Sequence, residues 1–313
     1  MVRETLATKI KQAAREVGFS ACGLVAAEEI TGEGERLDRW LADDCCAGME
    51  YLRNHREMRL DPRQLVPGAR TIISVALNYY PAERREEEEP YIAYYAYGKD
   101  YHVVMKKKLR ELWEKILPLH EGEEMPAMRA FTDSAPVLER YWAWRAGIGW
   151  IGRNTCLIIP GKGSYFFLGE IITTWEISAD DKPQQSRCGT CTRCVEACPT
   201  GALSQHRIDA RRCLSYLTIE HRGELPEREG KLLGGRIFGC DTCQKACPWN
   251  RFASPTEERA FQASPALLSL KKEQLAGLTV EEYNRIFAQS AVKRAKYDGL
   301  MRNIRANEDF YKH

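Results

Sequence analysis

The sequence lacks any long hydrophobic run, which excludes a transmembrane helix. No stretch of the 313 residues approaches the roughly 20 consecutive apolar residues that cross a bilayer. The first residues also lack the apolar core of a signal peptide, because Lys9, Lys11 and Arg15 interrupt it. We therefore predict a cytoplasmic protein that does not associate with a membrane.

Neither sign of charge predominates. The 46 Lys and Arg residues balance 44 Asp and Glu residues, which gives a net charge of +2. This balance excludes a uniformly basic nucleic-acid-binding protein, but it does not exclude a local basic patch. The sequence also has no Gly-rich nucleotide-binding fingerprint and no repeat outside its cysteine motifs. Its 44% apolar and 29% charged residues are ordinary for a globular protein.

Cysteine, by contrast, is abundant. Eight of the 12 cysteines lie between Cys188 and Cys247, and disulfides are rare in the cytosol. The first motif is Cys-x2-Cys-x2-Cys-x3-Cys-Pro, the bacterial ferredoxin pattern, and the second is Cys-x2-Cys-x3-Cys-Pro. Cys213 lies between them and completes the eight ligands that two [4Fe-4S] clusters need. We interpret Cys22 and Cys156, which lie in apolar runs, as core thiols.

In the ferredoxin pattern, the cysteine before proline binds the other cluster. We therefore predict that one cluster is bound by Cys188, Cys191, Cys194 and Cys247, and the second by Cys198, Cys213, Cys240 and Cys243. Two zinc sites are the alternative, which the run of closely spaced cysteines ending in Cys-Pro disfavours. Two clusters imply one-electron transfer to a redox centre in the rest of the chain, supplied by an external donor of the flavodoxin or ferredoxin type.

The remaining sequence mixes helical and strand patterns and predicts an α+β fold. Helices are expected over 3–17 and 103–117, and strands over 21–25 and 71–79. The polar residues and proline at 131–136 predict a helix start, with an end near Gly147, and the apolar runs 156–160 and 165–177 predict a β-hairpin. We expect three parts: 1–180, a ferredoxin-like 181–254, and a helical 255–313.

Several motifs outside the cysteines resemble those of the epoxyqueuosine reductase family, over most of the chain. They include Tyr97-Gly98-Lys99-Asp100-Tyr101-His102, Phe131-Thr132-Asp133-Ser134-Ala135-Pro136, Gly149-Trp150-Ile151-Gly152-Arg153-Asn154-Thr155 and Cys213-Leu214-Ser215-Tyr216. The resemblance implies a cobalamin-binding α+β domain related to the corrinoid domain of reductive dehalogenases. It also implies reduction of the epoxide of epoxyqueuosine, at the tRNA wobble position, to queuosine.

The resemblance also implies roles for particular residues. Asp133 matches the family's proton donor beside cobalamin, and Arg56, Tyr97 and Ser215 match weaker cobalamin contacts. Asp133 alone would be read as a helix cap, where the helix dipole lowers its pKa, whereas an acid working near neutrality needs a raised pKa. Core packing is the alternative for Tyr97, and we take His102 as structural.

A basic stretch near the end of the chain predicts tRNA contacts. It contains Lys293, Arg294, Lys296 and Arg302, and His221 and Arg222 near Cys213 are further candidates. A solvated helix face is the alternative. Longer members of the family continue into HEAT-like repeats about where this sequence ends, so either these repeats are dispensable or the tRNA is held by fewer contacts here. We expect a monomer.

Three other functions compete with this interpretation. A corrinoid and iron–sulfur reductase of a small molecule, such as an organohalide, would use the same chemistry. A non-catalytic electron carrier would leave the large N-terminal region without a role. A zinc-stabilised RNA-binding protein would contain no iron.

Overall fold

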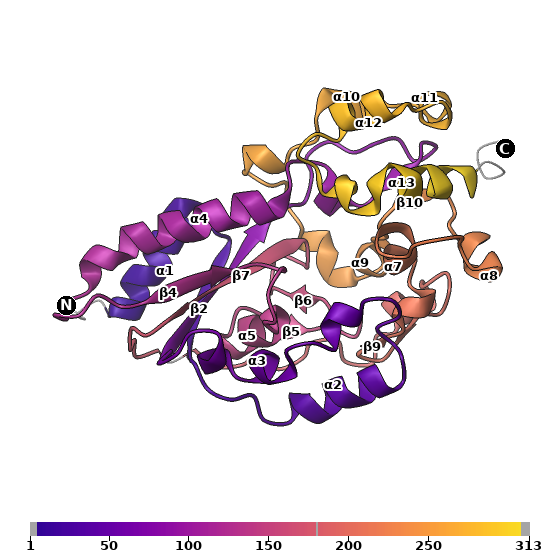
Figure 1. Ribbon diagram of the computed structural model, residues 1–313. Coiled ribbons are helices and arrows are strands. Elements are labelled where there is room, and N and C mark those ends of the chain that lie inside the picture. Colours follow the sequence, from indigo (N-terminus) through magenta and orange to yellow (C-terminus); the bar gives the residue numbers. More distant parts are fainter. Residues whose placement is uncertain (1–4, 180, 308–313) are drawn as a thin grey trace.

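The computed structural model describes residues 5–179 and 181–307 (Figure 1). At its centre is a four-stranded antiparallel sheet with strand order β1-β2-β7-β4. The strands are β1 (Ala21–Ala26), β2 (Thr71–Asn78), β4 (Met128–Phe131) and β7 (Phe166–Thr173). The β-branched and apolar residues of β2 favour an extended backbone, and Thr71 to Leu77 are all buried.

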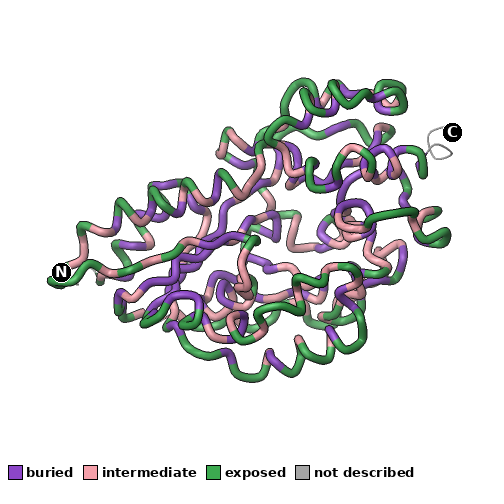
Figure 2. The backbone as a smooth tube through the Cα atoms, viewed as in Figure 1, coloured by how far each residue is buried: buried purple, intermediate pink, exposed green. Residues whose placement is uncertain are grey.

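Helices cover both faces of this sheet (Figure 1). One face carries α1 (Leu6–Val17) and α4 (Tyr101–Ile116), and the other carries α5 (Glu139–Arg145). Because side chains alternate along a strand, Ile73 packs with α1 and α4, and its neighbour Ile72 packs with α5. Burial is accordingly almost continuous along the two central strands β2 and β7, is partial along β1 and β4, and alternates around the helices (Figure 2).

The other elements are short. The remaining part of the N-terminal region contains α2 (Glu33–Ala42), α3 (Arg56–Leu60), β3 (Tyr91–Ile92), β5 (Trp150–Ile151) and β6 (Leu157–Ile158). The cysteine-rich region contains α6 (Arg193–Glu196), β8 (Leu203–Ser204), β9 (Arg207–Ile208), α7 (Leu214–Ile219), α8 (Glu227–Gly230), β10 (Arg236–Phe238) and α9 (Thr242–Lys245). The end of the chain contains α10 (Pro265–Leu268), α11 (Lys272–Ala276), α12 (Val280–Ile286) and α13 (Lys296–Arg305).

The structure confirms four of the predicted elements and corrects two others. The helices expected over 3–17 and 103–117 and the strands expected over 21–25 and 71–79 are present as α1, α4, β1 and β2. The predicted hairpin is wrong: β6 pairs with β5, and β7 pairs with β2 and β4. The helix predicted from 131–136 is also wrong at its start. Phe131 ends β4, and α5 begins at Glu139.

The regions expected as separate parts share contacts. The Asp181 carboxylate binds the Nζ of Lys11 at 2.6 Å and the backbone nitrogen of Leu24 at 2.8 Å, so it is not part of a free linker. Strand β10 pairs in parallel with β3, and α13 packs against β10. The boundary predicted at residue 180 falls on a residue outside the described part of the chain, and the three-part division stays a prediction. No helix among the described residues combines the length and apolar character needed to cross a membrane.

Candidate active site and cluster-binding cysteines

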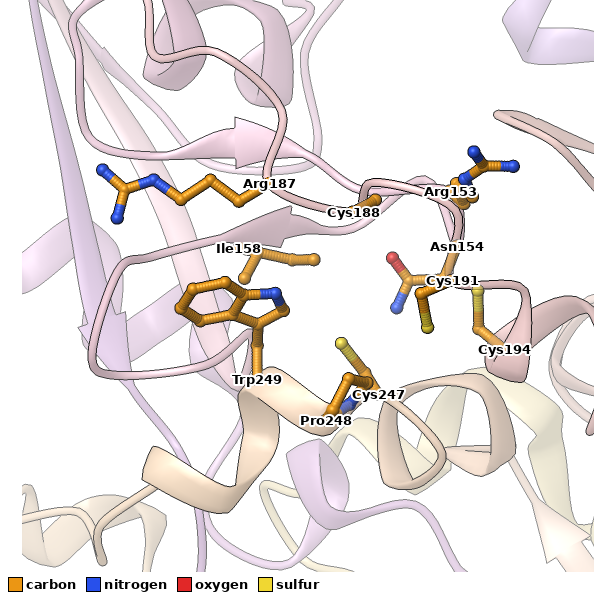
Figure 3. A pocket seen from close by; sticks show the side chains of 10 residues that line it. All are labelled: Arg153, Asn154, Ile158, Arg187, Cys188, Cys191, Cys194, Cys247, Pro248 and Trp249. Carbon is orange, nitrogen blue, oxygen red and sulfur yellow. The ribbon is translucent and has the colours of Figure 1, made fainter.

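Four of the predicted cluster ligands surround one cavity (Figure 3). Its thiols come from two distant segments, with Cys188, Cys191 and Cys194 on one side and Cys247 on the other. The two segments meet because α6 packs against α9. The sulfur atoms of Cys191, Cys194 and Cys247 lie apart from one another around this space (Figure 3). A cubane cluster is bound by thiolates spaced around it in this way. Arg153, Arg187 and Trp249 also line this cavity.

The other four predicted ligands are neighbours as well. Burial, together with the nearby Cys240 and Cys198, raises the pKa of the Cys213 thiol to about 11. Burial raises the pKa of Cys243, and Cys156, Cys240 and Cys213 raise it further. These thiols therefore favour their protonated form until a metal displaces the proton. Cys156, predicted as a core thiol, lies beside this group.

Asp133 lies in the turn between β4 and α5, with 59% of its side chain exposed. Its φ of +54° is in the left-handed region, so it does not begin a helix. The hydroxyl of Tyr101 donates a hydrogen bond to its Oδ2, and the Nε2 of His102 lies 3.2 Å from the same oxygen. This arrangement corrects the helix-cap interpretation. The predicted dipole effect on Asp133 does not apply, because α5 begins six residues later.

The pKa values of the two side chains place the proton that His102 and Asp133 share on His102. Burial raises the pKa of Asp133, but hydrogen bonds from His102 and Tyr101 and the charges of His102 and Arg294 outweigh it, and the net pKa is lowered. Hydrogen bonds to Asp100 and Asp133 raise the pKa of His102 to about 9. At neutral pH the pair is therefore an imidazolium and a carboxylate, with the transferable proton next to Asp133.

Tyr101 and His102 are functional candidates that the sequence interpretation missed. Asp100 caps α4 and accepts from the Nδ1 of His102, with 2.7 Å between the two atoms. The first turn of α4 thus directs both side chains towards Asp133. The rings of Tyr101 and His102 stack, with centroids 4.1 Å apart. The sequence signal for both residues is their place in the motif 97–102, which resembles the family's. That motif does not show that His102 contacts Asp133, because the two residues are 31 positions apart in the sequence.

A second group of side chains lies next to Asp133. The guanidinium of Arg294 binds both carboxylate oxygens of Glu220 at 2.8 Å. Its charge lowers the pKa of Asp133. Tyr51, 47% exposed, lies in the same neighbourhood: burial raises its pKa, and the charges of Glu220 and Asp133 raise it further. The site therefore combines segments near residues 51, 133, 220 and 294.

The residues predicted to contact cobalamin differ in burial and in their protein partners. Arg56 binds Asp38 with two hydrogen bonds of 2.7 Å. Tyr97 is 4% exposed and packs against Tyr94, so its position favours the alternative of core packing. Ser215, in the first turn of α7, is partly exposed and follows Cys213 directly. Asp133 is exposed and Arg56 and Ser215 are partly exposed, whereas Tyr97 is buried, and all four stay predicted contacts.

The six predicted tRNA contacts also differ from one another. Arg302 donates to the backbone oxygens of Leu217, His221 and Gly223, which ties α13 to the segment after Cys213. Arg222 donates to the backbone oxygens of Ile219 and Arg294. These two arginines therefore have structural partners. Of the other four, Lys293 and Lys296 are exposed and can contact tRNA phosphates. His221 and Arg294 have local partners: His221 binds the Glu224 carbonyl at 2.7 Å, and Arg294 binds Glu220.

Comparisons with known proteins identify the family of this chain. Residues 187–250 match the 4Fe-4S double cluster binding domain family, and residues 59–134 match a family described as epoxyqueuosine reductase QueG, DUF1730. An epoxyqueuosine reductase of Cellulophaga algicola is 44% identical over 298 residues, which cover 94% of this chain and 95% of that protein. One from Leadbetterella byssophila is also 44% identical, over 95% of this chain and 96% of that protein.

Solved structures give the same result. A crystal structure of an epoxyqueuosine reductase with an epoxyqueuosine-modified tRNA-Tyr stem loop has a TM-score of 0.88 and 29% identity. The match covers 97% of this chain and 81% of that one. The Bacillus subtilis enzyme, with its catalytic aspartate loop swung out of the active site, has a TM-score of 0.87 at the same identity and coverage. From its sequence identity to these relatives, the chain belongs to the epoxyqueuosine reductase family of oxidoreductases, with a 4Fe-4S double cluster domain.

Proposed function

We propose that this chain removes the epoxide oxygen of epoxyqueuosine in a tRNA anticodon, with Asp133 as the group that protonates the opening oxygen. The reaction consumes two electrons and two protons, and the oxygen leaves as water. The observation that carries the proposal is the outward-facing Asp133 carboxylate, with the hydroxyl of Tyr101 and the imidazole of His102 on one of its oxygens. Family membership supplies the substrate.

The Asp133–His102 pair supports proton delivery better than Asp133 alone. An isolated carboxylate with a lowered pKa is a poor proton donor near neutrality. Here the proton resides on His102, whose pKa is about 9, and its Nε2 lies 3.2 Å from Oδ2 of Asp133. His102 can protonate Asp133 as the oxyanion develops, and Asp100 keeps the imidazole oriented. Tyr101 stabilises the carboxylate between turnovers.

Two [4Fe-4S] clusters are proposed with the predicted ligands. Cys188, Cys191, Cys194 and Cys247 would hold one, and Cys198, Cys213, Cys240 and Cys243 the other. Cys188 and Cys191 are only partly buried, which suits electron entry from an external donor of the flavodoxin or ferredoxin type. The second set lies closer to the active site, because α7 links Cys213 to Glu220, the partner of Arg294.

Cobalamin is proposed as the redox centre between the clusters and the substrate. When bound, it supplies a low-valent cobalt that provides the electrons for deoxygenation. Asp133, Arg56, Tyr97 and Ser215 stay its proposed contacts: Asp133 is exposed, Arg56 and Ser215 are partly exposed, and the burial of Tyr97 makes it the least accessible. The relation of this region to the corrinoid domain of reductive dehalogenases stays a prediction.

The tRNA is proposed to approach over the ends of α7 and α13. Lys293 and Lys296 are exposed there and suit phosphate contacts. Arg294 lies nearer the active site and suits contact with the modified nucleotide, since its charge reaches Asp133. Arg222 and Arg302 hold this surface together through backbone oxygens. A monomer and a cytoplasmic location stay predictions.

The test is single-turnover reduction of epoxyqueuosine-containing tRNA. The protein is loaded anaerobically with iron, sulfide and cobalamin, reduced, and mixed with the tRNA, and the nucleosides are analysed by mass. Wild type should convert epoxyqueuosine into a product that lacks one oxygen. Asp133→Asn should keep its iron and corrinoid content and lose roughly 100-fold or more in rate.

Asp43→Asn is a matched control, because Asp43 is 57% exposed and pairs with Arg207 away from Asp133. It should behave as wild type. A loaded wild-type enzyme that leaves the nucleoside unchanged would refute the proposed substrate. An Asp133→Asn enzyme with full activity would refute only the assignment of the proton donor.

A further inference from the structure

A pair of glutamates lies directly behind the Asp133 turn. Glu170 is fully buried in β7, on the sheet face covered by α5, where its strand neighbours are Ser74 and Phe131. The Ser74 hydroxyl donates to Oε1 of Glu170 at 3.2 Å, whereas Oε2 is buried without a hydrogen-bond partner among the described residues. Glu139, the first residue of α5, is near enough that its charge raises the pKa of Glu170.

Burial shifts both carboxyls of this pair towards the protonated form. A buried carboxylate with an unpaired oxygen is strongly disfavoured, which favours a protonated Glu170. Burial and the charge of Asp133 raise the pKa of Glu139 to about 8, and burial raises that of Glu170 well above its usual range. The charged groups that act on Glu139 from neighbouring elements are Asp133, His102 on α4 and Arg140 on α5.

Glu139 also contacts the catalytic turn itself. The backbone nitrogen of Asp133 donates to Oε1 of Glu139 at 2.5 Å. Asp133 is held in a left-handed conformation that a residue with a side chain adopts only when its surroundings compensate. Tyr101 and His102 hold its side chain, and Glu139 holds its backbone. The turn is therefore fixed from two sides.

We propose that Glu139 is a positioning residue that holds the Asp133 turn in the active site by accepting the hydrogen bond from its backbone nitrogen. The catalytic role of the turn rests on the proposed function of Asp133. The hydrogen bond from the Asp133 backbone nitrogen to Glu139 does not depend on that proposed function. The corresponding test separates the two, because turn mobility is measured without turnover. A swung-out catalytic loop in the Bacillus subtilis structure shows that in that protein the loop has a second position.

The experiment measures hydrogen–deuterium exchange of peptides covering 131–138 in the full chain loaded with its clusters and cobalamin. Glu139→Ala removes the acceptor and should increase exchange at the turn roughly 10-fold or more. In the same variant, kcat for epoxyqueuosine-containing tRNA should fall by about the same factor while KM stays unchanged. Glu139→Gln keeps an acceptor oxygen and should restore both near pH 7. Glu114→Ala, which removes an exposed glutamate of α4, is the matched control and should match wild type.

The pH dependence gives a second measurement that does not depend on the alanine variant folding. Above pH 8 the wild-type Glu139 ionises and becomes a stronger acceptor for the Asp133 amide, whereas glutamine does not change. The ratio of turn exchange in Glu139→Gln to that in wild type should therefore rise above pH 8. Unchanged turn exchange in a folded Glu139→Ala protein, or a constant ratio across this pH range, would overturn the proposal.

Discussion

The cysteine-rich region and the Asp133 site are assembled in different ways. Seven of the eight predicted cluster ligands belong to two short motifs, in which local spacing already brings most of the thiols together. The Asp133 site instead combines side chains from the β4–α5 turn, α4 and α5. The second group beside it adds Tyr51, Glu220 and Arg294. Local folding of each motif therefore supplies at least half of the ligands of one predicted cluster, and each predicted cluster also takes a ligand from the other motif, whereas the acid site needs the whole sheet and its helices in place.

Removing a cluster ligand should have the largest effect and would test the local region. Cys213 is outside both motifs, so its assignment depends on position. Cys213→Ala should lose the iron of one cluster, about half of the total, together with all epoxide reduction. Iron analysis and electron paramagnetic resonance of the reduced protein measure this. Cys156→Ala removes a neighbouring thiol and is the control, which should keep both clusters. If Cys213→Ala kept its full iron and Cys156→Ala lost iron, Cys156 would be the ligand and Cys213 the core thiol.

Removing the histidine of the acid site should have the next largest effect. His102→Asn leaves Asp133 without its proton source and should slow single-turnover reduction by roughly 10- to 100-fold. Cluster and corrinoid contents should stay unchanged, since His102 lies outside the cysteine-rich region. Rate measurement at several tRNA concentrations separates kcat from KM. A variant affected only in KM would show that His102 serves binding and not proton delivery.

The same pair predicts a pH dependence. The pKa of His102 is raised from its usual 6.5 to about 9 by Asp100 and Asp133. A raised pKa means that the charged pair is fully formed below pH 6.5 and is lost as the pH rises through 9. The reduction rate should therefore fall above pH 9, and His102→Asn should abolish this limb. A rate measured from pH 6 to 10, with tRNA integrity checked at each value, gives the answer.

Arg302 should affect stability more than catalysis. It donates hydrogen bonds to backbone oxygens at the end of α7 and in the following loop, and its loss leaves some of these acceptors unpaired. Arg302→Ala should lower the free energy of unfolding by about 2 kcal/mol, measured by urea titration of the loaded protein. If Arg302→Ala kept near-wild-type stability and bound tRNA more weakly, Arg302 would act as a tRNA contact, as the sequence predicts, and not as a structural residue.

The smallest effect is expected at the exposed lysines. Lys296→Ala should weaken tRNA binding by only a few-fold and reduce its salt dependence by about one phosphate contact. Binding measured between low and moderate salt tests this. The same measurement with Arg294→Ala should show a larger loss of tRNA affinity, because Arg294 is near enough to Asp133 for its charge to lower the pKa of that residue.

The sequence predicted less about the acid site than about the cysteines, for a physical reason. Asp133 was identified only through resemblance, and its surroundings were predicted wrongly, because the polar residues and proline at 131–136 signal a helix start equally well when the helix begins later. His102 was set aside because the sequence does not reveal its contact with Asp133. Likewise, β7 was expected in a hairpin, but its apolar run suits a central strand equally well.

By itself, the sequence determined the α+β class, several helices and strands, the eight clustered cysteines and, through resemblance, the family. The elements and the cysteine motifs follow from periodicity and spacing, which are local properties of the chain, whereas the family follows only from the motifs that carry the resemblance. Only the tertiary structure decided that the proton favours His102, that Glu139 holds the Asp133 turn, and that Arg302 ties α13 to α7. These features depend on burial and on contacts between distant segments, because charge and hydrogen bonding act through space and not along the chain.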